Sequence, residues 1–206
     1  MGIKAGPKVV RDGLIFNIDT AVSRSYSGSG KTFYGLVGGI GATISGTIGF
    51  TSINNGSISL NNNSQGYILV PSLTWRSVCL YVKYDSTQGG SYYLIDGRTG
   101  VVNSYFYSDP GGPIGSAWSS FYVNGNQTTI ANSNGLANTS LFQRDKWTHV
   151  YLELSGIGTG DIHIFGRYSN NETSSGNISQ VQIYNRTLTA QEIKQNYNAT
   201  KRRYGL

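Results

Sequence analysis

Apolar and polar side chains alternate with a period of two in several separate stretches, and this pattern constrains the fold more than any other feature of the chain. In residues 14–19, 77–84, 150–154 and 180–184, every second side chain is apolar over most of the stretch. A period of two gives a strand one buried face and one wetter face, as in a sandwich of two sheets. The alternation therefore predicts an all-β protein, a two-sheet antiparallel sandwich.

Turn-forming residues separate these stretches. The 206-residue chain contains 28 glycines and only 13% charged residues, a composition unlike that of disordered chains. Asn124-Gly125 predicts a hairpin turn, and residues 109–113 predict a loop. No linker divides the chain, so we expect one domain over residues 1–206. The single cysteine, Cys79, excludes an internal disulfide and should lie in a strand as a small apolar residue.

One helix is expected, over residues 189–200 near the end of the chain. Thr189 and Glu192 have the spacing of a capping box, in which each side chain satisfies a free backbone N–H. Leu188 and Ile193 stand where a hydrophobic staple would lie. The basic residues that follow the helix complement its dipole.

Positive charge gathers at the two ends of the chain. An extended arm, residues 1–12, carries Lys4, Lys8 and Arg11, and a basic tail, residues 201–206, carries Lys201, Arg202 and Arg203. These six residues either form a solvated surface or dock the protein on an acidic partner. The rest of the +6 net charge is scattered, so we expect no nucleic-acid partner. The start of the chain lacks the apolar stretch of a signal peptide and no run is long enough to span a membrane, which predicts synthesis in a host cytoplasm and no membrane insertion.

The motifs near both ends resemble those of laminin-G-like domains within the concanavalin A-like lectin and glucanase group. Residues 12–19 are similar to the opening motif, residues 146–150 to an internal strand start with Trp147 and His149, and residues 176–193 to the closing motif. The resemblance implies a concanavalin A-like jelly roll. The terminal peptides are similar to those of single-domain structural proteins of tailed phages, which implies a place on the virion surface.

The residues do not support catalysis. Retaining glycosidases pair two carboxylates about 5 Å apart. Glu153, Glu172 and Glu192 each lack an acidic neighbour two residues away, and no Gly-x-Ser-x-Gly elbow is present. His149 and His163 lie within predicted strands and are interpreted as sheet residues, so no metal site is expected.

Calcium is not expected as a cofactor. Many laminin-G-like domains hold this ion with loop carboxylates, and the corresponding loop here, residues 60–67, carries amides instead. Asp19 is the one remaining candidate ligand.

Aromatic residues gather in the middle of the chain. The candidate residues for a glycan site or a protein interface are Tyr92, Arg98, Tyr105, Tyr107, Trp118 and Tyr122. Lectin sites place an aromatic face beneath a sugar ring, interfaces are enriched in Tyr, Trp and Arg, and the same residues can simply pack within a sheet. These three interpretations remain open.

The sequence therefore predicts a non-catalytic structural protein of a tailed phage virion, a decoration or cement protein in contact with other virion proteins. The alternative is a receptor-recognition module on a tail or fibre that binds a host-surface glycan. A homo-oligomer is left open. Within the chain, the six basic residues at the ends are the candidate docking residues.

Overall fold

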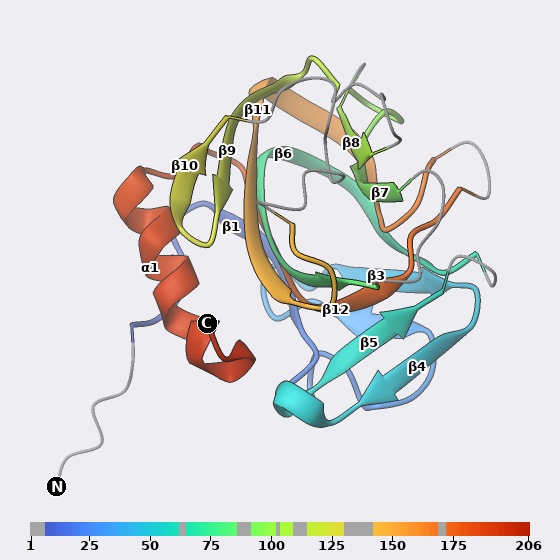
Figure 1. Cartoon of the computed structure of the whole chain (residues 1–206). Coiled ribbons are helices and arrows are strands. Elements are labelled where there is room, and N and C mark those ends of the chain that lie inside the picture. Colours follow the sequence, from blue (N-terminus) through green and yellow to red (C-terminus); the bar gives the residue numbers. More distant parts are fainter. Residues whose placement is uncertain are drawn as a thin grey trace, which may run out of the picture.

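The fold was analysed in a computed structural model, which describes residues 7–61, 65–85, 92–101, 104–108, 115–129, 142–168 and 172–206. Twelve strands and one α-helix form within these residues (Figure 1). The strands are β1 (Leu14–Asp19), β2 (Thr32–Tyr34), β3 (Gly41–Ser45), β4 (Ile48–Thr51), β5 (Ser57–Leu60), β6 (Tyr67–Tyr84), β7 (Tyr92–Asp96), β8 (Tyr105–Ser108), β9 (Trp118–Val123), β10 (Asn126–Thr128), β11 (Trp147–Ile164) and β12 (Gly176–Tyr184). The helices are α1 (Ala190–Thr200) and the short 3₁₀ helices η1 (Ile53–Asn55) and η4 (Lys201–Tyr204). The predicted all-β fold with a short C-terminal helix is confirmed.

Two 18-residue strands, β6 and β11, organise the sheet and curve through the molecule (Figure 1). Their halves near Val82 and Val150 belong to a layer ordered β10-β9-β11-β6-β12-β5-β4, with β1 also paired to β12. Their other halves, near Ile68 and Ile164, pair with β3 and β7 in a second layer. The sequence predicted two sheets, whereas the described strands form one continuous antiparallel network because β6 and β11 serve both layers.

The main core lies on the inner sides of these layers. The predicted inward residues of β1 alternate with less buried ones, in the pattern expected for a half-buried strand. Apolar side chains from both layers form one buried cluster, whose members include Phe16, Phe33, Ile58, Ile68, Trp75, Leu80, Leu94, Phe106, Leu152 and Ile183. Burial of this apolar surface is the main favourable contribution to folding.

The alternation in β6 predicted that its outer face is exposed to solvent. In the structure this face is buried. Cys79 is 2% exposed and packs in a second cluster with Leu188 and Ile193, while Tyr81 packs against Tyr204. The second cluster also contains Val10 of the N-terminal segment. The C-terminal segment and the N-terminal segment therefore cover the side of the sheet that faces away from the main core.

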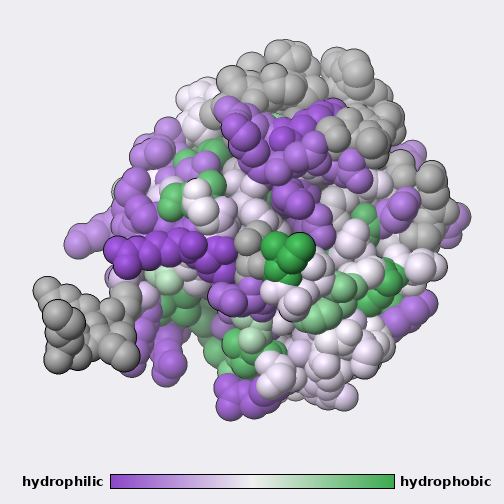
Figure 2. Space-filling model, turned by 60° about the horizontal axis from the view of Figure 1, so that its bottom comes forward, coloured by the Kyte–Doolittle hydropathy of each residue, from purple (hydrophilic) through white to green (hydrophobic). Residues whose placement is uncertain are grey.

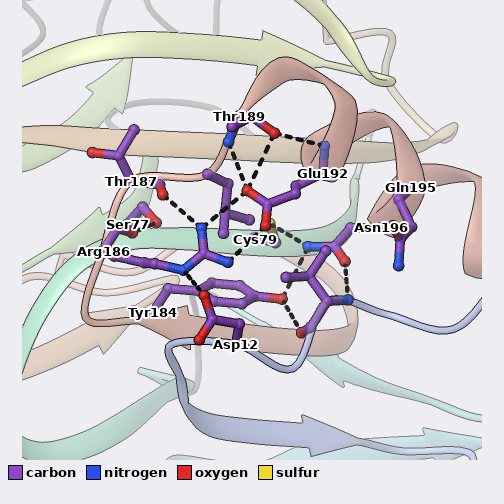
Figure 3. Close-up of polar contacts among 12 residues, drawn as sticks. Asp12, Ser77, Cys79, Tyr184, Arg186, Thr187, Thr189, Glu192, Gln195 and Asn196 are labelled. Atoms are coloured by element: carbon purple, nitrogen blue, oxygen red, sulfur yellow. Dashed lines mark hydrogen bonds and ion pairs between the residues drawn. The ribbon is translucent and has the colours of Figure 1, made fainter.

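The start of α1 confirms the predicted capping box. Thr189 Oγ1 accepts a hydrogen bond from the Glu192 backbone N–H at 3.2 Å, and the Glu192 carboxylate accepts the Thr189 N–H at 2.9 Å (Figure 3). Asn196, farther along the helix, accepts the Val10 N–H at 2.8 Å and donates to the Tyr184 hydroxyl at 2.9 Å. These contacts fix α1 across β12. No helix among the described residues is long and apolar enough to cross a membrane.

Candidate functional site

The predicted aromatic cluster is only partly assembled. Arg98 lies with its Cζ atom 4.5 Å from the centre of the Tyr105 ring. Trp118 lies behind them, 8% exposed, and its Nε1–H donates to the Tyr105 carbonyl at 2.9 Å. Tyr122 packs on Tyr151 in the cluster beneath α1, so it does not join this group.

Two further predicted residues, Tyr92 and Tyr107, belong to the paired strands β7 and β8. Their side chains lie outside what the structure describes. Of the six candidates, only Arg98 and Tyr105 are thus seen as neighbours near the surface. Tyr168, which the sequence analysis did not select, lies beside Arg98 as well.

Arg98 is already engaged within the chain. Its Nη2 lies 2.6 Å from the fully buried Asp96 carboxylate, and its Cζ lies 5.6 Å and 5.2 Å from the rings of Tyr93 and Tyr168. Burial lowers the pKa of Arg98, but its hydrogen bonds to Asp96 and Tyr93 outweigh this effect and raise it overall. The guanidinium therefore lies over the rings of Tyr93, Tyr105 and Tyr168, with its charge paired to Asp96.

The basic ends are divided between the surface and the interior. Lys8, Arg11 and Arg202 are exposed, and Lys4 lies outside the described residues. Lys201 Nζ lies 5.1 Å from the Tyr197 ring centre. Arg203 turns inward, with its side chain 10% exposed and Nη1 2.7 Å from Asp19 Oδ1. Its charge is thus paired inside the chain.

An open hollow lies at the end of the sheet that carries β4. Its volume is about 570 Å³, and we call it the edge hollow. One wall is the turn after β1 and the other is β4 with η1; the lining residues are Thr20, Ala21, Ser23, Tyr26, Ser27, Gly28, Phe50, Ser52 and Asn55. Figure 2 turns this end of the molecule toward the viewer and shows green and white surface bordered by purple.

Aromatic and neutral polar groups share the edge hollow. Phe50 is 41% exposed and packs at 5.6 Å, ring centre to ring centre, against the buried Tyr26. Burial raises the pKa of Tyr26, whose hydroxyl donates to the Gly30 carbonyl at 2.9 Å. None of the nine lining residues carries a charge. The hollow therefore offers an apolar ring face beside hydroxyl and amide groups.

Sequence reasoning missed the edge hollow because its walls come from separate segments. Ser27 and Gly28 belong to a glycine-rich stretch, residues 27–32, that follows no ligand-binding pattern by itself. Phe50 was the available signal, as an aromatic residue in a short strand. The alternation in this strand is weak, so the sequence does not predict which way the Phe50 side chain faces.

The surroundings of Asp19 do not fit a calcium ion. Asp19 Oδ1 accepts from Arg203 and from the Ala21 N–H at 2.9 Å, and Oδ2 accepts from Gln180 at 2.5 Å. A guanidinium thus stands where the cation would have to bind, and calcium requires several free oxygen ligands. Among the described residues, no group of three or more His, Cys, Asp or Glu side chains could hold a metal ion.

Several groups that could transfer protons are tied up or buried. Arg186 lowers the pKa of Glu192 to about 2, and burial lowers the pKa of His149 to about 3. Glu153 lies 3.4 Å from Arg76 and also accepts from Thr187 at 2.9 Å. A general acid at neutral pH needs a raised carboxyl pKa, which is the opposite of the shift at Glu192.

No protein-family model and no curated protein matches this chain. Solved structures do. Trypanosoma rangeli sialidase in complex with sialic acid is 12% identical with a TM-score of 0.59, and the match covers 95% of this chain and 34% of that chain. Domain 4 of AbnA, a GH43 extracellular arabinanase from Geobacillus stearothermophilus, in complex with arabinotriose, is 16% identical with a TM-score of 0.56, over 89% of this chain and 98% of that chain.

The binding domain of Paraclostridial Mosquitocidal Protein 1 is 14% identical with a TM-score of 0.56, over 91% of this chain and 52% of that chain. The chain spans about a third of the sialidase chains that it matches. At these identities the likeness shows the fold alone: a lectin-like β-sandwich, found both in parts of glycosidases and in binding domains. The narrower resemblance of the end motifs to laminin-G-like domains stays a prediction.

Proposed function

We propose that this chain is a non-catalytic carbohydrate-binding module and that the edge hollow is its binding site. The observation that carries the proposal is the half-exposed Phe50 ring beside the hydroxyl and amide groups of Ser23, Ser52 and Asn55. Sugar rings stack their apolar faces on aromatic side chains, while neighbouring polar groups bind the hydroxyls. The aromatic cluster around Arg98, expected from the sequence, is less suited because the arginine already lies over its rings and is paired with Asp96.

The ligand class is a neutral sugar. A hydroxyl or a carboxamide both donates and accepts hydrogen bonds, which matches the hydroxyl groups of a neutral saccharide. An acidic sugar would bring a carboxylate to a site whose lining residues carry no cation. The arabinanase domain solved with arabinotriose shares the fold over nearly its whole length and supports a carbohydrate ligand, but other structures with this fold hold sialic acid, so the neutral class rests on the lining residues alone.

The absence of catalysis is part of the proposal. It is supported by the arginine partners of Glu153 and Glu192 and by the lowered pKa of His149. Incubation of the protein with each oligosaccharide that it binds should release no new reducing ends. If wild-type protein released new reducing ends and a variant lacking one carboxylate did not, the protein would be a hydrolase.

Calorimetric titration tests the binding site with a panel of arabinotriose, cellotriose, maltotriose and lactose, and with sialyllactose as the acidic sugar. Phe50→Ala should weaken binding of the neutral sugar about tenfold or more, because it removes the stacking face. Asn55→Gly removes the amide but keeps the backbone, since Asn55 has φ of 63°, a left-handed conformation that glycine adopts freely.

Ile157→Ala is the matched control for that titration. Ile157 is 70% exposed and lies on β11, outside the edge hollow, so its removal should leave the affinity unchanged. Wild-type protein that binds none of the sugars, or Phe50 and Asn55 variants that bind as well as wild type, would refute the proposal.

We further propose, from the sequence, that the module is displayed on a tailed phage virion, either as a receptor-recognition part or as a decoration protein. The exposed Lys8, Arg11 and Arg202 support a docking role for the chain ends. Gold-labelled antibody on intact virions tests the location. Label on the tail tip favours receptor recognition, label over the head favours decoration, and unlabelled virions would refute both. Contacts with virion proteins and self-association stay predictions.

A further inference from the structure

The two walls of the edge hollow are joined at their base by buried hydrogen bonds. Thr20 Oγ1 donates to the Gly56 carbonyl at 2.6 Å, which links the turn after β1 to the segment after η1. Ser179 of β12 donates its hydroxyl to the same carbonyl at 2.8 Å and accepts the Thr20 N–H on its own carbonyl at 3.0 Å. The position of one wall relative to the other therefore depends on this joint, together with the packing of Phe50 on Tyr26.

Arg203 reaches the joint from the far end of the sequence. Its Nη1 lies 2.7 Å from Asp19 Oδ1, which also accepts the Ala21 N–H of the first wall. Its Nη2 donates to the Gly56 carbonyl at 3.0 Å and to Ser179 Oγ at 2.5 Å. One planar guanidinium thus holds both walls and the strand between them. A lysine ammonium has no such fork and cannot reproduce this set of contacts.

The tail that carries Arg203 has a separate anchor. Tyr204 is 7% exposed and stacks on Tyr81, with ring centres 4.4 Å apart and planes inclined by 20°. Its ring centre also lies 4.7 Å from that of Trp147. Because η4 contacts η1 as well, the tail can remain docked when the side chain of Arg203 is changed.

We propose that Arg203 is a positioning residue for the edge hollow, so that the sugar site is complete only when the end of the chain is docked beneath it. The inference rests on the proposed function. Arg203 is absent from the lining residues; its Nη2 donates to one of them, Thr20, at 3.4 Å, and it otherwise acts through Asp19 and Gly56. A substitution of Arg203 should therefore change the affinity for sugar, although all the residues that line the hollow remain the same.

The test compares Arg203→Gln, Arg203→Lys and the control Arg202→Gln, an exposed neighbour on the same short helix. Each is titrated with the same neutral oligosaccharide panel, well below its melting temperature and with its folded fraction measured. We expect Arg203→Gln to weaken binding about tenfold or more, Arg203→Lys to recover part of the loss, and Arg202→Gln to bind as wild type. Amide NMR shifts of Ala21 and Gly56 should move only in the Arg203 variants.

Three outcomes separate the proposals. Wild-type affinity in a folded Arg203→Gln variant would overturn the positioning role and leave the proposed function intact. Loss of binding that follows only the loss of folded protein would assign Arg203 to general stability and overturn the positioning role as well. Failure of the wild type to bind any sugar of the panel would refute the proposed function and, with it, the positioning role.

Discussion

The guanidinium of Arg186 and the carboxylate of Glu192 form a two-pronged ion pair, with Nη1 to Oε2 at 2.9 Å and Nη2 to Oε1 at 2.6 Å (Figure 3). Arg186 Nε also lies 2.8 Å from Asp12 Oδ2. Since Glu192 closes the capping box of α1, this one arginine connects the N-terminal segment, the end of β12 and the start of the helix. The cover over the outer face of the sheet depends on this connection.

The ion pair should make the helix cover sensitive to acid. The hydrogen bonds from Arg186 lower the pKa of Glu192 from 4.5 to about 2. As the pH falls from 4.5 toward 2, the unfolded chain takes up this proton first, so the free energy of unfolding decreases in that window. Denaturant unfolding at a series of pH values should show this loss in wild type and a smaller one in Glu192→Gln. Parallel curves for the two proteins would contradict the prediction.

A second acid-sensitive group should act at higher pH. His149 is fully buried between Tyr81 and Tyr197, and neither ring nitrogen has a hydrogen-bond partner among the described residues. Burial lowers its pKa from 6.5 to about 3. Below pH 6.5 the unfolded chain therefore binds a proton that the folded chain does not. The free energy of unfolding consequently decreases as the pH is lowered.

His149→Phe removes this proton uptake while keeping a flat ring. Its free energy of unfolding should exceed that of wild type by a margin that grows on acidification, on the order of 2 kcal/mol near pH 4.5. The measurement is the same denaturant series. A margin that stays constant from neutral pH to about pH 4 would show that His149 does not titrate as predicted.

The thiol of Cys79 should be protected in the folded protein. Cys79 is 2% exposed, and burial raises the pKa of its thiol to about 12. Since the thiolate is the reactive form, labelling by an aromatic disulfide reagent near neutral pH should be about a thousandfold slower than in the denatured chain. Rapid labelling without denaturant would mean that α1 opens readily from the sheet.

The local pattern predicted the elements well and their covering poorly. The alternation in residues 14–19 and the capping box at Thr189 each depend on neighbours in sequence, so they predicted β1 and α1 correctly. The alternation near Cys79 predicted a wetter face, but the pattern does not record that a distant helix covers it. Tyr122, for which packing within a sheet was one of three open interpretations, lies buried beneath the same helix.

The candidate site depended on distances that no local pattern contains. Phe50 and Tyr26 become neighbours only when β4 takes the end of the sheet order. Arg203 belongs to a run of cations that resembles a solvated tail, yet it pairs with Asp19, 184 residues earlier. The sequence shows the chemical character of each of these residues, but it does not show which of them are brought into contact by the fold.

Both layers share the strands β6 and β11. Among the described strands there is therefore no boundary at which one layer could separate from the other. β11 pairs with β6 from Trp147 against Lys83 to Ile164 against Ile68, so partners lie far apart in the chain. We therefore expect the completion of both layers to depend on the pairing of these two strands. Folding should therefore be slow for the chain's size and cooperative, with the layers gained and lost together.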